Sequence, residues 1–240
     1  MEDWKYNTAR DLGLEASEAM KSIQREVGLP GRLTNSFRHV LAKWYLQAYH
    51  HFKVEGSANL PRQLPFILVA NHSSHLDALA LASVLPMRLN ANVFPVAAGD
   101  TFFKAPSTAL FASFFMNALP IWRRNCGAHT MENLRERMLE EPCGYILFPE
   151  GTRSRDGKMG RFKPGIGMLV AGTSVPIVPC HLTGAYDAFP PQDKLPKPRT
   201  IRLRVGRPLY FGDIPNGRKG WGDVASTLEK AVRELGVMAK

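Results

Sequence analysis

Residues 65–77 read PFILVANHSSHLD, an apolar run that passes directly into polar and ionisable residues. The run 65–70 has the length and the β-branched character of a strand buried on both faces, which is typical of parallel sheets. Ser74 and Asp77 have capping-box spacing, which predicts that a helix begins near Ser74. A strand that leads into a helix in this way indicates an α/β fold, in which sites lie at the carboxyl ends of strands.

The rest of the chain repeats this alternation, so the predicted fold class is α/β. We expect a central, mostly parallel or mixed sheet flanked by helices, preceded by an N-terminal helical hairpin. Further strands are predicted at 93–98, 144–148, 176–182 and 200–205, and helices at 1–30, 33–52, 75–85, 106–118, 128–140 and 222–236. The Pro/Lys-rich segment 189–199 is predicted to be an exposed loop. The predicted division is an N-terminal helical part, 1–53, and an α/β domain, 54–240.

The predicted helix 33–52 carries a stripe of apolar and aromatic residues, which allows two interpretations. The stripe consists of Leu33, Phe37, Val40, Leu41, Trp44, Tyr45, Ala48 and Phe52. In the first interpretation it packs on the core. In the second it lies on a bilayer surface, which suits aromatic side chains with Arg38, Lys43 and Lys53 beside them.

Composition excludes several classes of protein. Of 240 residues, 45% are hydrophobic and 22% charged, which is not the composition of a disordered chain. The three cysteines, Cys126, Cys143 and Cys180, have no CxxC spacing, so neither a disulfide scaffold nor a four-cysteine zinc site is expected. No charge-free run reaches the ~20 uninterrupted apolar residues of a membrane span. The polar beginning, MEDWKYNTAR, does not resemble a signal peptide.

The chain is basic, with a net charge of +10, nearly all of it beyond residue 60. Such a surface attracts phosphate in nucleic acid, in anionic lipid or in a phosphorylated substrate. No helix-turn-helix, zinc-finger or RNA-binding motif is present, so nucleic acid is not an expected partner.

Two histidines and a carboxylate follow the strand 65–70. If the chain breaks between strand and helix, Asp77 can reach the imidazole of His72, fix its tautomer and leave the other ring nitrogen free as a base. A purely structural, hydrogen-bonded histidine is an equally good interpretation. Metal binding by His72, His75 and Asp77 is a third, although their spacing matches no standard metal motif.

A second polar segment, FPEGTRSRDG at 148–157, follows the predicted strand 144–148. Gly151 permits a tight turn with exposed N–H groups, Thr152 adds a hydroxyl donor, and Arg153 can bind a phosphate through two hydrogen bonds. Glu150 does not fit such an anion site unless it binds a hydroxyl group or an arginine. The alternative is a basic surface turn, which suits Arg155, Lys158, Arg161 and Lys163 better than it suits Arg153.

Together these segments resemble the glycerolipid acyltransferases, specifically the 1-acylglycerol-3-phosphate acyltransferases. NHSSHLD at 71–77 matches that family's His-x4-Asp motif, and FPEGTRS at 148–154 matches its Phe-Pro-Glu-Gly-Thr-Arg block. PIWR at 120–123 and VPIVP at 175–179 correspond to two further blocks, in the same order. One departure is that Asn117 or Ala118 stands where the family has a turn glycine. Because Arg124 follows Arg123, which of the two faces the site stays open.

The resemblance implies transfer of a fatty acyl group to the free hydroxyl of a lysophospholipid, most simply 1-acylglycerol-3-phosphate. His72 would be the general base and Asp77 would orient it, without a covalent intermediate and without a metal. The implied substrate-binding residues are Arg123, Glu150, Gly151, Thr152, Arg153 and Pro176. Acyl-CoA or acyl carrier protein would be the donor co-substrate, and no other cofactor is implied.

The implied location is the cytoplasmic face of a membrane, peripherally bound to an anionic surface. Three alternatives stay open. One is an acyltransferase for another lyso-lipid, such as an aminolipid. The second is a hydrolase, although no G-x-S-x-G motif is present. The third is a basic binding protein without enzymatic activity.

Overall fold

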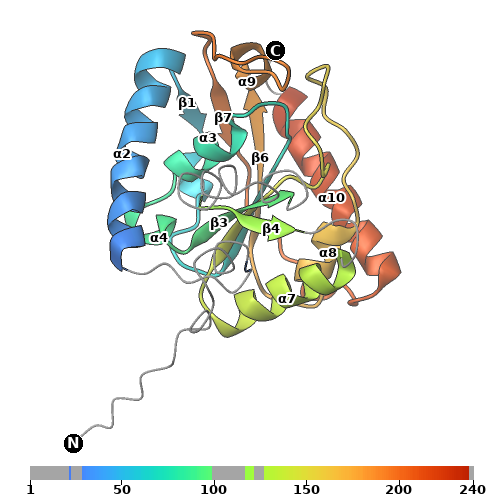
Figure 1. Cartoon of the computed structure of the whole chain (residues 1–240). Coiled ribbons are helices and arrows are strands. Elements are labelled where there is room, and N and C mark those ends of the chain that lie inside the picture. Colours follow the sequence, from blue (N-terminus) through green and yellow to red (C-terminus); the bar gives the residue numbers. More distant parts are fainter. Residues whose placement is uncertain (1–21, 23–28, 99–116, 122–126, 238–240) are drawn as a thin grey trace, which may run out of the picture.

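A seven-stranded mixed sheet forms the centre of the protein in a computed structural model, which describes residues 22, 29–98, 117–121 and 127–237 (Figure 1). The strand order is β1-β7-β6-β2-β5-β3-β4. The strands are β1 (Lys53–Glu55), β2 (Phe66–Ala70), β3 (Val93–Ala98), β4 (Leu119–Ile121), β5 (Gly144–Leu147), β6 (Ile177–Thr183) and β7 (Arg202–Val205).

The strands β6, β2, β5, β3 and β4 run parallel to one another, whereas β7 is antiparallel to β6 and parallel to β1. Since β2 is fully buried and lies between β6 and β5, its carboxyl end is central to the sheet. Asn71 extends this pairing beyond β2. Its side chain donates to the carbonyl of Leu182 at 3.0 Å and accepts from the Leu182 N–H at 2.8 Å. The polar segment after β2 therefore starts from a fixed point.

Helices cover both faces of the sheet. They are α2 (Leu29–His50), α3 (Asp77–Ser83), α4 (Met87–Asn90), α7 (Gly127–Glu140), α8 (Gly165–Val170), α9 (Ala185–Ala188) and α10 (Arg218–Val237). Alternate residues of β2 enter two cores, as a period of two requires. Ile67 and Val69 share one core with α7, α8 and α10, whereas Phe66 and Leu68 share the other with α2, α3 and α4.

The predicted α/β fold class is confirmed, and each predicted strand is present within two residues of its expected bounds. The helices expected at 75–85, 128–140 and 222–236 are α3, α7 and α10. The segment 189–199 contains no helix or strand, as expected. The helix expected at 1–30 falls almost wholly outside the described residues, as does the one at 106–118. The predicted division at 53/54 falls inside β1 and is not tested further.

The sequence did not indicate β1, β4, α4, α8 or α9. These elements have three to six residues, too few for a periodic pattern to develop. Their conformation is set by the neighbours against which they pair or pack.

The helix α2 corrects one expectation. The residues that it buries are Asn35, His39, Ala42, Leu46 and His50, not most of the apolar stripe. Phe37 is 73% exposed and Trp44 67%, and Val40 and Leu41 are also exposed. Of the stripe residues whose side chains the structure describes, from Phe37 onward, only Tyr45 and Phe52 pack against the core. Interpreting the stripe as core-facing was therefore wrong for most of its length, because a partly polar face of the helix packs on the domain.

Two glycines provide a matched test of the packing between α8 and α10. A Cβ atom at Gly167 would lie 2.3 Å from the Cα and 2.6 Å from the carbonyl oxygen of Trp221, whereas one at Gly222 would meet nothing within 4 Å. We expect Gly167→Ala to lower the free energy of unfolding by ~1–3 kcal/mol, because the backbone of α10 at Trp221 must move to make room for the methyl group. Gly222→Ala should raise it by ~0.5–1 kcal/mol, because alanine favours the helix. Urea unfolding measures both, and equal effects would contradict this packing.

Candidate functional site

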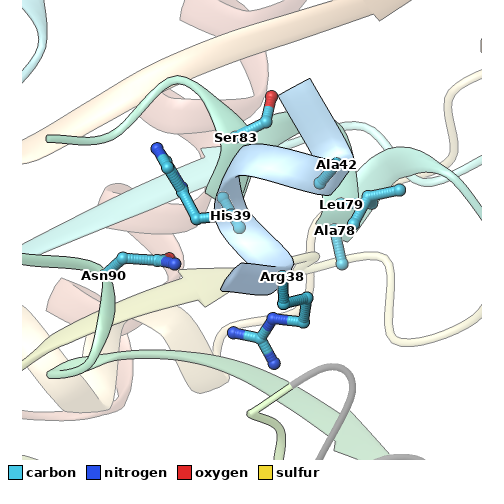
Figure 2. Close-up of a pocket in the computed structure, with 8 residues that line it drawn as sticks. Arg38, His39, Ala42, Ala78, Leu79, Ser83 and Asn90 are labelled. Atoms are coloured by element: carbon cyan, nitrogen blue, oxygen red, sulfur yellow. The ribbon is translucent and has the colours of Figure 1, made fainter. Parts of the chain in front are cut away.

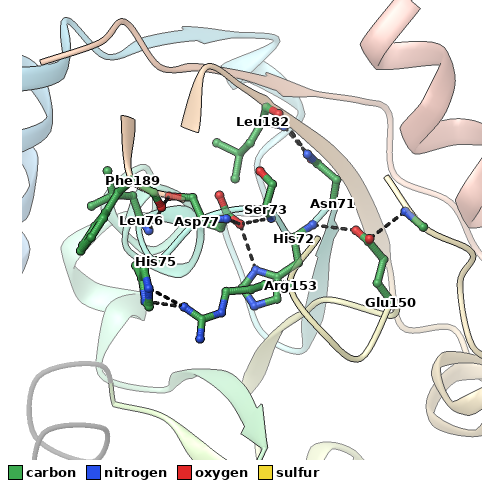
Figure 3. Close-up of polar contacts among 12 residues, drawn as sticks. Asn71, His72, Ser73, His75, Leu76, Asp77, Glu150, Arg153, Leu182 and Phe189 are labelled. Atoms are coloured by element: carbon green, nitrogen blue, oxygen red, sulfur yellow. Dashed lines mark hydrogen bonds and ion pairs between the residues drawn. The ribbon is translucent and has the colours of Figure 1, made fainter. Parts of the chain in front are cut away.

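The loops that follow β2 and β5 form the site, at the carboxyl edge of the sheet. β2 and β5 are neighbours, with Val69 paired to Leu147. The N–H of Ser154 donates to the carbonyl of His72 at 2.8 Å, which joins the two loops directly. Figure 3 shows the polar groups of both loops turned toward one another. The structure thus brings the segments 71–77 and 148–154 together, 77 residues apart in sequence.

His72 and Asp77 form a hydrogen-bonded pair. His72 Nδ1 lies 2.9 Å from Asp77 Oδ2, and Asp77 is completely buried. The same Oδ2 accepts from the N–H groups of Ser73 at 2.7 Å and Ser74 at 2.8 Å. The contact to Ser74 has the predicted three-residue spacing, but α3 begins only at Asp77, with Leu76 at its N-cap, so Ser74 does not cap the helix. The turn at 74–76 supplies the expected break between strand and helix. The carboxylate is therefore fixed by the backbone before it meets the imidazole.

This arrangement determines which nitrogen of His72 carries a proton. An ionised carboxylate only accepts hydrogen bonds, so Nδ1 must donate to it and the neutral ring has its lone pair on Nε2. No described residue is hydrogen-bonded to Nε2, and the His72 side chain is 21% exposed. The ring also stacks on Phe148, with centroids 4.0 Å apart and planes 16° apart. The ring of His72 is thus held by Phe148 on one face and by Asp77 at Nδ1, and the described residues leave its Nε2 free to act as a base.

Glu150 is buried beneath the His72 backbone. It is 7% exposed, and its Oε1 accepts from the His72 N–H at 2.7 Å while Oε2 accepts from the Gly160 N–H at 2.8 Å. Burial raises the pKa of this carboxyl, and the two backbone hydrogen bonds oppose the rise. These bonds account for a carboxylate beside a candidate anion site: Glu150 connects three chain segments. A substrate hydroxyl would have to share oxygens that are already bonded.

Arg153 lies on the same side of the site as His75. Its Nη1 contacts His75 Nδ1 and lies 2.9 Å from Nε2. Gly151 adopts φ +75°, a conformation that favours glycine, and forms the turn before Arg153. A Cβ at Gly151 would lie 2.7 Å from Lys163 Nζ, so Lys163 extends along this turn as a second cation. Thr152 is exposed at the tip of the turn.

Three contributors to the site were not predicted: the stacking of Phe148, the N–H of Gly160 and the cation of Lys163. Phe148 directly follows β5, the neighbour of the strand that leads to His72. An aromatic residue at that strand end is a signal that the sequence offers. For Gly160 and Lys163 no such signal exists, because only the path of the loop from Gly151 to Lys163 brings them back.

Of the remaining predicted residues, one lies outside the described residues and one lies at the other end of β2. Arg123 falls outside the described residues, as does Arg124. Pro176 precedes β6 and its carbonyl accepts from the Ile67 N–H, at the amino end of β2. That is about five residues from His72, or ~16 Å along an extended strand. Pro176 therefore lies at the opposite end of β2 from His72, and its part in substrate binding stays a prediction.

Asn117 explains the absence of a glycine in the turn before β4. It adopts φ +51°, which asparagine tolerates better than other residues with a side chain. Its Nδ2 donates to the carbonyls of Ala91 and Val93, both at 3.2 Å. Asparagine therefore supplies both the turn conformation and hydrogen bonds that fix the start of β4.

The described cysteines do not suit covalent catalysis. Cys143 and Cys180 are buried, and burial raises the pKa of both thiols, that of Cys180 to about 12. A thiol with a raised pKa forms little of the nucleophilic thiolate. As for metal, the described part of the chain holds no group of three potential ligands among histidine, cysteine, aspartate and glutamate. His75, one of the three residues considered as metal ligands from the sequence, contacts Arg153 instead.

A small cavity lies between α2 and the helices α3 and α4, apart from the site (Figure 2). It holds about 10 Å³, room for one water molecule. Burial lowers the pKa of His39 on its wall, and His39 Nδ1 has no hydrogen-bond partner among the described residues. The interface beneath α2 is therefore polar and incompletely packed.

The chain is similar to known acyltransferases. A family described as Acyltransferase matches residues 51–183. The chain is 28% identical over 198 residues to a chloroplastic 1-acyl-sn-glycerol-3-phosphate acyltransferase of Brassica napus, covering 75% of this chain and 52% of the relative. It is 31% identical over 170 residues to the beta form of Homo sapiens, covering 68% of this chain and 59% of the relative. The chain thus spans about half the length of these curated relatives.

One solved structure supports the fold. The crystal structure of the 1-acyl-sn-glycerophosphate (LPA) acyltransferase PlsC from Thermotoga maritima matches with a TM-score of 0.65 at 24% identity, covering 88% of this chain and 80% of that one. The family match covers more than half of the chain and contains both loops of the site. The chain therefore belongs to the acyltransferase family.

Proposed function

We propose that this protein transfers a fatty acyl group from a thioester donor to the free hydroxyl of a lysophospholipid, with 1-acylglycerol-3-phosphate as the preferred acceptor. The observation that carries the proposal is the His72–Asp77 pair at the carboxyl end of β2, with Nε2 unbonded among the described residues and Arg153 in the adjoining loop. The names of the curated relatives support the choice of acceptor.

The proposed chemistry needs only this pair and the two substrates. His72 Nε2 takes the proton of the acceptor hydroxyl as its oxygen attacks the thioester carbonyl. Asp77 stabilises the imidazolium that forms, since it already accepts from Nδ1. The tetrahedral intermediate then expels the thiolate as the C–S bond breaks, and His72 returns the proton to the sulfur. No acyl-enzyme forms and no cofactor takes part.

The acceptor phosphate is assigned to Arg153 and the Gly151 turn, with Lys163 nearby. Arginine binds phosphate through two parallel hydrogen bonds. The Gly151 N–H itself donates to the Phe148 carbonyl at 3.0 Å, so the turn contributes by placing Arg153. The donor is either acyl-CoA or acyl carrier protein, and the assay below distinguishes them.

The test is transfer of a labelled acyl group to lysophosphatidic acid, in the presence of lipid vesicles. Long-chain acyl-CoA and acyl carrier protein are supplied separately, and His72→Ala is the control. Product with wild type and a loss of orders of magnitude in the variant supports the proposal. Acylation of other lyso-lipids alone, such as an aminolipid, would replace the acceptor. If no acceptor is acylated, the proposed activity is wrong.

We further propose that the outer face of α2, formed by Phe37, Val40, Leu41 and Trp44, binds an anionic membrane surface. These side chains are exposed, and α2 contains no acidic residue. Of its basic residues, Lys43 is exposed beside Trp44, whereas Arg38 lines the cavity beneath the helix. Aromatic and aliphatic side chains with cations beside them suit the interface of a bilayer. No described helix is long and apolar enough to cross a membrane. We propose that this contact is made with the cytoplasmic face of the membrane.

Replacing Phe37 and Trp44 by serine should reduce binding to vesicles of anionic phospholipid by ~10-fold or more, because burying a large apolar side chain is worth ~1.5–3 kcal/mol. Co-sedimentation measures the bound fraction. The matched control replaces Tyr210 and Val237, which are exposed on other parts of the surface, by serine. Equal losses in both double variants would assign the effect to general hydrophobicity and contradict the role of α2.

A further inference from the structure

His75 is the polar group of the site to which the proposed chemistry gives no role. It stands between His72 and Asp77 in sequence, but its ring turns toward Arg153 and not toward that pair (Figure 3). The ring is held on two sides. It packs on Phe189 with centroids 4.6 Å apart, and its Nε2 lies 3.4 Å from the carbonyl of Pro191.

These contacts select a protonation state for His75. A carbonyl only accepts, so the Pro191 contact needs a proton on Nε2, which leaves the lone pair on Nδ1. Arg153 only donates, and its Nη1 lies against both ring nitrogens, 2.9 Å from Nε2. A neutral ring has one lone pair to accept from it, and the Pro191 contact assigns that lone pair to Nδ1. Burial and the positive charge of Arg153 lower the pKa of His75, which agrees with a neutral ring. A protonated His75 would turn two donors and a positive charge toward the guanidinium.

Arg153 is itself half-buried, and burial lowers its pKa. A guanidinium has five N–H donors in a fixed plane. When His75 engages Nη1, the rest of the fork remains for a ligand, and its direction is set by the histidine.

We propose that His75 is a positioning residue for Arg153, which it holds, as a neutral hydrogen-bond acceptor, in the orientation that binds the acceptor phosphate. This inference rests on the proposed function, in which Arg153 meets that phosphate. In this role His75 affects the affinity for the acceptor and not the rate of the chemical step.

The contact itself is tested by NMR without reference to activity. The imidazole ¹⁵N signals of His75 should show the Nε2–H tautomer and a pKa below the usual 6.5. In Arg153→Met that pKa should rise, because the nearby positive charge is gone. An unchanged pKa, or the Nδ1–H tautomer in wild type, would overturn the proposal. This result stands even if no acyl transfer is detected, so failure of the proposed function remains distinguishable.

Two substitutions of His75 separate a positioning role from a packing role. The two roles predict opposite answers to which substitution raises KM more. His75→Asn keeps an acceptor where Nδ1 stands, whereas His75→Phe keeps a ring against Phe189 and removes the acceptor. We expect KM for lysophosphatidic acid to rise ~10-fold in His75→Phe, with kcat close to wild type, and to change less in His75→Asn. If asparagine is the more damaging substitution, or if kcat falls and KM does not, His75 has a packing or chemical role instead.

Combining variants completes this test. Once Arg153 is replaced by methionine, His75→Phe should raise KM no further, since nothing is left to position. Independent, multiplying effects on KM would overturn the proposal.

A pH profile gives a further readout. The titratable and charged groups that act on His75 are Arg153 in the adjoining loop and His72 and Asp77 in its own, while Phe189 and Pro191 contribute none. Because the pKa of His75 lies below 6.5, its protonation should raise KM of wild type relative to His75→Asn, which cannot titrate, only as pH falls through that lowered pKa. The midpoint of this change should agree with the pKa that NMR gives for His75, and a ratio that stays constant through that pKa would contradict the proposal.

Discussion

Replacing His72 by asparagine should lower kcat for acyl transfer by ~10²–10⁴-fold, the usual contribution of a general base. The substitution is chosen because the amide nitrogen of asparagine can occupy the position of Nδ1 and donate to Asp77 Oδ2, as the ring does at 2.9 Å. The contacts of Asp77 with Ser73 and Ser74 then persist. What is lost is Nε2, the nitrogen that takes the proton. Initial rates at saturating donor and acceptor measure the effect.

The matched control is His51→Asn. His51 is exposed and adopts φ +44°, a conformation that asparagine accommodates well. It should retain full activity and stability. If His72→Asn stays within a few-fold of wild type while it remains folded, His72 is not the base, and the pair with Asp77 is structural.

Glu150→Gln should lower both stability and kcat. Glu150 accepts two backbone N–H groups, one on each oxygen, at 2.7 and 2.8 Å. Glutamine has one oxygen, so one N–H would face an amide donor, and a buried donor without an acceptor costs ~1–3 kcal/mol. One of the two N–H groups belongs to His72, so its displacement should lower kcat by ~10–100-fold, as small misplacements of reacting groups do. Urea unfolding and initial rates measure the two effects.

Glu229→Gln distinguishes the two consequences. Glu229 on α10 accepts the backbone N–H of Phe162 at 2.8 Å on Oε2, and Arg233 at 3.0 Å on Oε1, away from the His72–Asp77 pair. Its replacement should also reduce stability, but kcat should not change. If Glu150→Gln loses stability and keeps its kcat, the bond to the His72 N–H does not position the base.

Much of the fold could be predicted from sequence because its central strands are buried on both faces. PFILVA and GYILF are continuous apolar runs, and the polar segments after them mark the carboxyl ends of two strands. The helix α2 shows where this approach fails. An apolar stripe normally indicates the buried face, but here Phe37 and Trp44 are exposed while Asn35 and His39 are buried. Periodicity reports that a helix has two unlike faces and does not report which face meets the domain.

By itself, the sequence determined the chemical groups of the site: a histidine and an aspartate across a strand-to-helix break, and a glycine turn with an arginine after a second strand. Local geometry is sufficient there, because the short turn between His72 and Asp77 places the imidazole against the carboxylate. Only the tertiary structure decided what Glu150 and His75 contact. Parallel pairing of β2 with β5 brings Glu150 to His72 and Arg153 to His75, whereas the path of the loop from Gly151 to Lys163 returns Gly160 to Glu150.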